Sequence, residues 1–196
     1  MSKKWLVLLA ALLTGQAVFT DLAAADRKTL YMRQKKQETV CLQNLQNLYN
    51  YLNLYAKNNQ GAYPAGNNFA GLKKLFALGI APTNFYCEDY RGKKTKKLAD
   101  LNETTNPYLY FGNFDRKLIE SSPKVVLICS KPASRHHLAL LGDGSIVDIG
   151  EKLPKIKIKS AYDIVEALNT LYKYPSGVLN TLRNKARLMD KQSAGK

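Results

Sequence analysis

The chain has 196 residues, of which 45% are hydrophobic. This is enough for one ordinary domain with a buried core and excludes an intrinsically disordered protein. Its 30 basic and 15 acidic residues give a formal net charge of +15, which favours acidic partners over basic ones.

The N-terminal 25 residues have the composition of a secretory signal peptide. Two lysines precede an apolar run from Trp5 to Phe19, and three alanines at 23–25 follow it. The run of fifteen residues is shorter than the ~20 residues that a membrane-spanning helix needs. We therefore expect cleavage after Ala25 and export, with retention of the segment as an N-terminal membrane anchor as the alternative.

A long helix is predicted next, because residues 26–57 contain neither proline nor glycine. Apolar residues at steps of three and four form a stripe on this helix, namely Cys41, Leu45, Leu48, Leu52 and Tyr55. Gly61 suits the C-terminal cap, and Pro64 prevents continuation of the helix. A second, short helix is predicted over residues 69–80, ending near Gly79.

The chain has three cysteines, and export would let one pair form a disulfide. Cys41 lies on the apolar helix face and is interpreted as a small buried hydrophobic residue. Cys87 and Cys129 lie near predicted strands and are our preferred disulfide pair. The sequence contains no cysteine and histidine pattern with the spacing of a structural zinc site.

The most basic stretch, RGKKTKK at residues 91–97, is predicted to be an exposed loop. Its cations and the nearby tyrosines have the composition of a surface that binds a nucleic-acid strand through phosphates and stacking. The candidate residues for binding a polyanion are Arg91, Lys93, Lys94, Lys96 and Lys97. A solvated lysine loop is the alternative interpretation.

Strands are predicted at residues 107–113 and 124–130, which are rich in aromatic and β-branched residues. Asp143 and Gly144 join two further apolar segments and favour a tight hairpin. The expected fold class is α+β, with the long N-terminal helix packed on a small antiparallel sheet. We expect Leu45, Leu48, Leu52 and Tyr55 to form the contact between helix and sheet.

The last segment, residues 151–196, is predicted to be a basic helical extension. Ser160 is placed as the N-cap of a helix whose apolar side is formed by Ile164, Val165, Leu168 and Leu171. A final basic amphipathic helix follows the break at 175–177. It is expected to pack on the domain, to dock on a partner, or to lie on an anionic membrane surface.

Some histidine, aspartate and cysteine residues could form a reactive site but also have simpler interpretations. His136 and His137, with Asp143, are expected to belong to a hydrogen-bonded loop rather than to a metal or acid–base centre. Cys129 near His136 lacks an evident third group for nucleophilic catalysis, and Cys41 is expected to be too buried for it. We therefore predict that the chain is not an enzyme and has no catalytic or cofactor-binding residues.

Two motifs of residues 26–150 resemble pseudopilin-like, prepilin-type proteins related to the major pseudopilin of type II secretion. The first is a C-x-x-N-L helix that ends in Y-A-x-x-N-x-G-x-Y-P, and the second is a closing DG hairpin. The positions that match are Cys41, Asn44, Leu45, Tyr55, Ala56, Asn59, Gly61, Tyr63, Pro64, Cys87, Tyr108, Tyr110, Gly112, His137, Asp143 and Gly144.

The resemblance implies a helical spine that supports a globular head and assembles through helices rather than performing catalysis. It also raises calcium as a ligand of Asp143, Asp148 and Glu151, although their spacing is not that of a defined calcium loop. The usual prepilin peptidase signal is missing, since Lys4 replaces the family's glycine and Leu9 its glutamate. A soluble or membrane-tethered relative of the head domain is therefore at least as expected as a fibre subunit.

The expected organisation is a signal peptide or membrane segment at 1–25, a pseudopilin-like domain at 26–150 and the extension at 151–196. We expect an exported structural or interaction protein, periplasmic or anchored in the inner membrane facing the periplasm. It would be a component or relative of a type II secretion or type IV pilus assembly, with other envelope or pseudopilin-like proteins as partners. The alternative is a cationic envelope protein that binds DNA or another acidic polymer.

Overall fold

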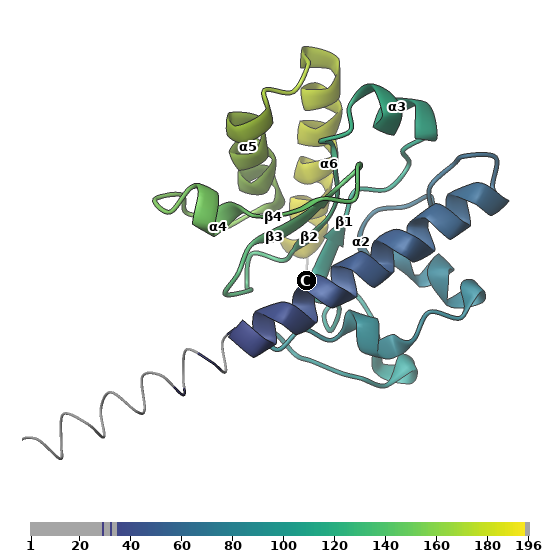
Figure 1. The fold of residues 1–196 in the computed structure, drawn as a ribbon, viewed down its shortest axis with the longest axis vertical. Helices are drawn as coiled ribbons and strands as arrows, with labels where there is room; N and C mark the ends of the chain where they lie inside the picture. The colour runs from purple at the N-terminus through teal and green to yellow at the C-terminus, as the bar shows by residue number, and fades with distance from the viewer. Residues whose placement is uncertain (1–28, 30–31, 33–34, 195–196) are drawn as a thin grey trace, which may run out of the picture. The chain divides into compact units, whose positions relative to one another are not determined.

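The computed structural model describes residues 29, 32 and 35–194 (Figure 1). The chain divides into two compact units, Met1–Glu38 and Thr39–Lys196, and the account that follows concerns the second. The predicted signal segment and its cleavage site lie outside the described residues. Among the residues described, no helix is both long and apolar enough to cross a membrane.

The fold is α+β, as predicted, with a four-stranded antiparallel sheet in the order β1-β2-β3-β4 (Figure 1). Residues 35–58 are helical, and we call the part in the second unit, residues 39–58, the N-terminal helix. The following elements are α2 (Asn68–Leu72), η1 (Lys73–Leu78), η2 (Pro82–Phe85), η3 (Leu98–Asp100), β1 (Tyr108–Tyr110), α3 (Arg116–Ser121), β2 (Val126–Ser130), β3 (Leu138–Leu141), β4 (Ile146–Asp148), α4 (Ile149–Lys152), α5 (Ala161–Tyr172) and α6 (Ser176–Ala194).

The apolar stripe of the N-terminal helix faces the core, as predicted. Leu45, Leu48 and Leu52 are fully buried, and Tyr55 is partly buried. The helix is also tied down by polar contacts, since Asn44 Nδ2 donates to the Tyr86 carbonyl at 2.7 Å. It ends before Gly61, whose φ of +87° is favoured by glycine.

The register of the strands shows which side chains share a face of the sheet. Leu109 of β1 is opposite Cys129 of β2, which is opposite Ala139 of β3, so these three side chains share one face. This face lies toward α6, because Leu109 lines a cavity together with Asp190 of α6, and α5 packs beside α6 (Figure 1). Tyr110 is on the other face, where its hydroxyl donates to the Pro64 carbonyl at 3.0 Å.

Strand β1 is shorter than predicted and forms an edge of the sheet. The strand ends at Tyr110, and Asn113, three residues beyond this end, has a φ of +59°. The Tyr108 N–H and C=O point away from β2, because the neighbouring odd-numbered residues make the bonds to β2. The Asn106 side chain binds both outward groups, at 3.2 and 2.7 Å.

The predicted hairpin joins β3 and β4. Gly144 has a φ of +80° and packs against the ring of Tyr49. Asp143 Oδ1 accepts hydrogen bonds from the backbone N–H and the hydroxyl of Ser145, while Oδ2 forms an ion pair with Lys124 at 2.6 Å. These contacts and the Lys124 ammonium lower the pKa of Asp143, against the opposing effect of burial.

The C-terminal helices pack on the domain, the first of the three arrangements that the sequence left open. Ser160 caps α5, with its hydroxyl accepting from the Asp163 N–H at 3.1 Å, as predicted. Leu182, Ala186 and Met189 of α6 are fully buried. Arg183 of α6 and Glu166 of α5 form a bidentate ion pair with contacts of 2.6 and 2.8 Å, which joins the two helices.

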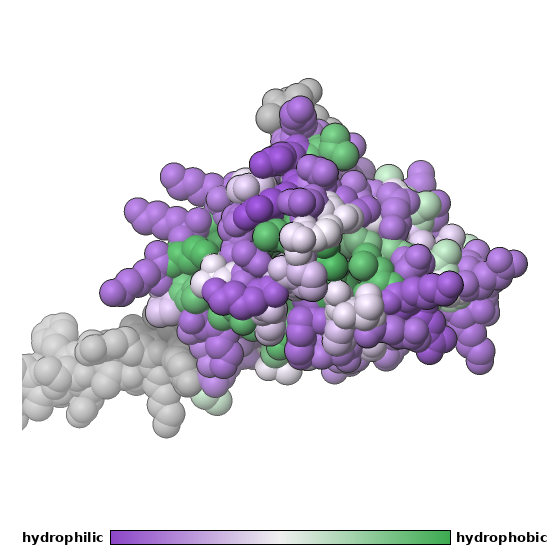
Figure 2. All heavy atoms as spheres, turned by 90° about the horizontal axis from the view of Figure 1, so that it is seen from above, coloured by the Kyte–Doolittle hydropathy of each residue, from purple (hydrophilic) through white to green (hydrophobic). Residues whose placement is uncertain are grey.

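Hydrophilic side chains cover most of the face shown in Figure 2, with hydrophobic side chains in smaller groups between them. In the second unit, the large hydrophobic residues that remain exposed are Val40 and Leu54 on the N-terminal helix, Leu98 in η3 and Leu188 on α6. Single exposed residues of this kind are usual on protein surfaces.

Candidate functional site

The disulfide joins Cys41 to Cys87, with the two Cα atoms 5.4 Å apart, so the predicted Cys87–Cys129 pair is wrong. Cys129 is a free, buried thiol on the face of the sheet that lies toward α6. Burial raises the pKa of this thiol and keeps it protonated. Cys41 is buried, as expected, but it fastens the N-terminal helix to the chain ahead of β1.

A buried carboxylate lies next to this disulfide. Asp89 is 1% exposed, and its Oδ2 lies 4.0 Å from Cys41 Sγ. Within the part of the chain that the structure describes, Asp89 Oδ1 has no hydrogen-bond partner. His136 lies between Asp89 and Asp148, with nitrogen to carboxylate distances of 3.8 and 3.5 Å.

The residues considered for metal binding have other roles in the structure. Among the described residues, only Cys41, Cys87 and Asp89 bring three potential ligand atoms within 4.8 Å of one another, and both sulfurs are in the disulfide. Asp143 is held in the hairpin turn, and Asp148 Oδ1 accepts from two N–H groups at the start of α4. Their carboxylates therefore already have partners within the fold.

The other histidine, His137, is half-buried and precedes β3. Its Nδ1 has no hydrogen-bond partner within the described part of the chain. Burial lowers the pKa of His137 because it disfavours the imidazolium form.

The basic loop at residues 91–97 is exposed and lies outside helices and strands, as predicted. Two of its candidate cations already have contacts within the chain. Lys94 Nζ donates to the Glu88 carbonyl at 2.6 Å, and Lys96 Nζ lies 4.3 Å from the centre of the Tyr86 ring. The binding role of the loop stays a prediction.

The structure adds Arg135 to this basic region. Residues 89–91 pair with residues 133–135 through an isolated antiparallel bridge. The Arg91 N–H donates to the Ala133 carbonyl, and the Arg135 N–H to the Asp89 carbonyl, both at 3.1 Å. Arg135 has no neighbouring cluster of charges in the sequence, which is why the composition of the chain does not single it out.

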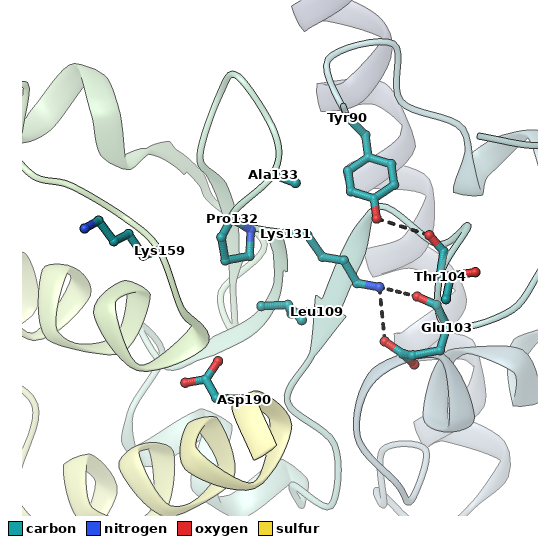
Figure 3. A pocket seen from close by; sticks show the side chains of 9 residues that line it. All are labelled: Tyr90, Glu103, Thr104, Leu109, Lys131, Pro132, Ala133, Lys159 and Asp190. Atoms are coloured by element: carbon teal, nitrogen blue, oxygen red, sulfur yellow. Dashed lines mark hydrogen bonds and ion pairs between the residues drawn. The ribbon is translucent and has the colours of Figure 1, made fainter. Parts of the chain in front are cut away.

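A cavity of about 360 Å³ lies beside these paired loops, at the end of the sheet where β1 begins and β2 ends (Figure 3). We call it the hollow. Its apolar wall is formed by Leu109, Pro132, Ala133 and the ring of Tyr90. Lys159 and Asp190 line it on the side of α5 and α6 (Figure 3).

Several polar groups that line the hollow are held by bonds within the chain. Lys131 Nζ lies 3.1 Å from Glu103 Oε1 and also donates to the Glu103 carbonyl. The Tyr90 hydroxyl donates to the Thr104 carbonyl at 3.1 Å, and burial raises the pKa of this hydroxyl. The hollow is therefore a preformed feature, of a size in the lower range of small-molecule pockets.

Asp190 on α6 is the least predictable residue of the hollow. Its carboxylate oxygens accept hydrogen bonds from the N–H groups of Ala161 and Tyr162 at 2.7 and 3.1 Å. A negative charge at the N-terminus of a helix is favourable, so α5 partly compensates this carboxylate. The residue lies 29 positions after Ala161, and no local sequence pattern indicates this contact.

No protein-family model matches the chain, and no curated protein or solved structure matches it.

Proposed function

We propose that the chain is an exported structural or interaction protein related to the pseudopilin-like components of type II secretion or type IV pilus systems. The observation that supports the export part of this proposal is the Cys41–Cys87 disulfide. Disulfides persist in oxidising compartments such as the bacterial periplasm and are rare in the cytosol. The signal-like composition of the first 25 residues independently favours the same destination.

The N-terminal helix is the proposed assembly element. Its apolar stripe is occupied by the chain's own core, which leaves the opposite side for partners. Val40 and Leu54 are 42% and 43% exposed and are separated by 14 residues, about four helical turns. They therefore lie on the same side of the helix. Other envelope or pseudopilin-like proteins are the proposed partners of that side.

The export proposal is tested by the location and the thiol count of the protein in its native cells. Cells are fractionated, and the protein is denatured and alkylated without reduction. We expect a periplasmic or membrane-bound protein with one modified cysteine, Cys129, because the other two are in the disulfide. A cytoplasmic protein with three modified cysteines would overturn the proposal. The intact mass then distinguishes a chain that begins at Asp26 from one that retains the apolar segment.

A second function, binding of DNA or another acidic polymer, is favoured by one observation. The pairing of residues 89–91 with 133–135 places Arg135 in the same region as the basic loop. Clustered cations bind phosphates and release counterions, so the affinity for a polyanion should fall steeply with salt. Binding to DNA that is insensitive to salt, or no binding at low salt, would contradict this function.

A further inference from the structure

We propose that the hollow accepts a base of single-stranded nucleic acid while the cations around it contact the adjacent phosphates. This inference rests on the second function proposed above and makes it specific. It identifies the proposed polymer as a strand with unpaired bases, rather than a duplex or an acidic polysaccharide.

The hollow offers an apolar surface that a flat aromatic ring can cover. Pro132 and Ala133 supply the more exposed apolar side chains, whereas Leu109 and the Tyr90 ring line the hollow but are largely buried, on either side of Lys131 (Figure 3). The Tyr90 hydroxyl is bonded to the Thr104 carbonyl, which fixes the ring in place. Proteins that bind single strands use such aromatic and apolar surfaces for bases, because every base has an apolar face.

Exposed cations from three segments adjoin this surface. Lys159 lines the hollow, Arg91 is bonded through its backbone to Ala133 on the wall, and Arg135 follows two residues later. Among the residues that the structure describes, these three side chains form no ion pair with a carboxylate. Lys159 at the hollow and the two arginines on the neighbouring loops are the cations that would contact the phosphates of a bound strand.

The carboxylates at the hollow are paired with a cation or partly compensated by backbone N–H groups of the chain itself. Glu103 pairs with Lys131, and Asp190 accepts two N–H groups at the start of α5. The exposed cations therefore dominate the charge around the hollow, which favours an anionic ligand.

The combination of an apolar hollow and a cationic surround favours an unpaired base over the other polyanions. The bases of a duplex are stacked and paired, so their faces are not available to a pocket. An acidic polysaccharide supplies the charge but has no aromatic ring for the hollow. A single strand supplies both, and its flexible backbone lets phosphates reach cations on two sides.

The test compares two fluorescently labelled 12-nucleotide strands with the same number of phosphates, one with adenine bases and one abasic. Binding to the purified protein is measured by fluorescence anisotropy at several salt concentrations. We expect the strand with bases to bind about tenfold more tightly or better, as stacking of one base would give. For about three phosphate contacts, the affinity should fall about 20-fold between 50 and 200 mM salt.

Matched variants connect the result to the hollow. Ala133→Leu narrows the hollow from an exposed wall position without adding an aromatic face for stacking, and should reduce the preference for bases. Ala77→Leu, at an exposed position of η1 outside the hollow, should leave the preference unchanged. Arg135→Glu should weaken both strands, whereas Lys117→Glu on α3 should have little effect. Circular dichroism and an intact disulfide verify that each variant is folded.

The outcomes separate the two proposals. Equal, salt-dependent affinity for both strands would retain polyanion binding but overturn the base-binding inference, as would tighter binding of a duplex or of heparin. A preference for bases that is unchanged in Ala133→Leu would also overturn it. No binding of any of these polymers at low salt would overturn both the inference and the polyanion function, and would leave the export proposal untouched.

Discussion

Replacing both Cys41 and Cys87 by alanine should lower the free energy of unfolding by about 4 kcal/mol. The disulfide spans 46 positions of the chain, so it restricts the unfolded chain strongly. The loop-entropy relation for a closed loop of about 46 residues gives about 13 cal/mol/K, or about 4 kcal/mol at 25 °C. Both cysteines are buried, so small cavities should add to this loss.

The assay is urea unfolding followed by circular dichroism, with and without a thiol reductant. The oxidised wild type should lose most of the same stability when the reductant is added, whereas the double variant should not respond to it. The comparison controls for the cavities, because reduction breaks the bond without removing a side chain. A wild type equally stable in both conditions would refute the assignment of this disulfide as a main stabilising link.

Three further predictions concern the helices and the hairpin. Asp190→Ala removes the acceptor of two N–H groups at the start of α5 and should lower the free energy of unfolding by about 1–2 kcal/mol in the same urea assay. Gly144→Ala places a methyl group 2.6 Å from the Tyr49 ring and should cost more than Gly79→Ala, where φ is similar but nothing lies within 4 Å; equal costs would contradict the packing described. Arg183 on α6 donates hydrogen bonds to Glu166 and thereby lowers the pKa of the Glu166 carboxyl. The ionised carboxylate therefore adds to the free energy of unfolding above about pH 4.3. This contribution is lost as the pH falls through the pKa of Glu166 in the folded protein. Glu166→Gln should therefore lose less stability than the wild type between pH 7 and pH 3 in urea unfolding, and an equal loss would remove this role.

Patterns confined to one segment were sufficient to predict much of the fold. The spacing of Leu45, Leu48 and Leu52 identified the buried helix face, and Ser160 and Gly144 marked a cap and a turn through their own chemistry. Each of these signals depends on residues a few positions apart. They hold in the structure because the local preference and the tertiary packing agree.

The cysteine pairing and the hollow depended on features that a single sequence does not contain. The face on which Cys129 lies is set by strand register, and a shift of one residue would place it on the opposite face. Arg135 reaches the basic region through a bridge between two loops, and Asp190 reaches the hollow from α6. Only the three-dimensional arrangement brings these residues together, so residue type and local spacing did not identify them.

The Asn106 side chain occupies backbone groups at the edge of the sheet that β1 forms. It occupies the outward N–H and C=O of Tyr108, the groups that an incoming strand from another molecule would need. An incoming strand would also have to displace α2, which packs against β1, and Asn106 and Tyr108 are themselves fully buried. Copies of the chain that meet at high local concentration therefore do not find in β1 a template for aggregation.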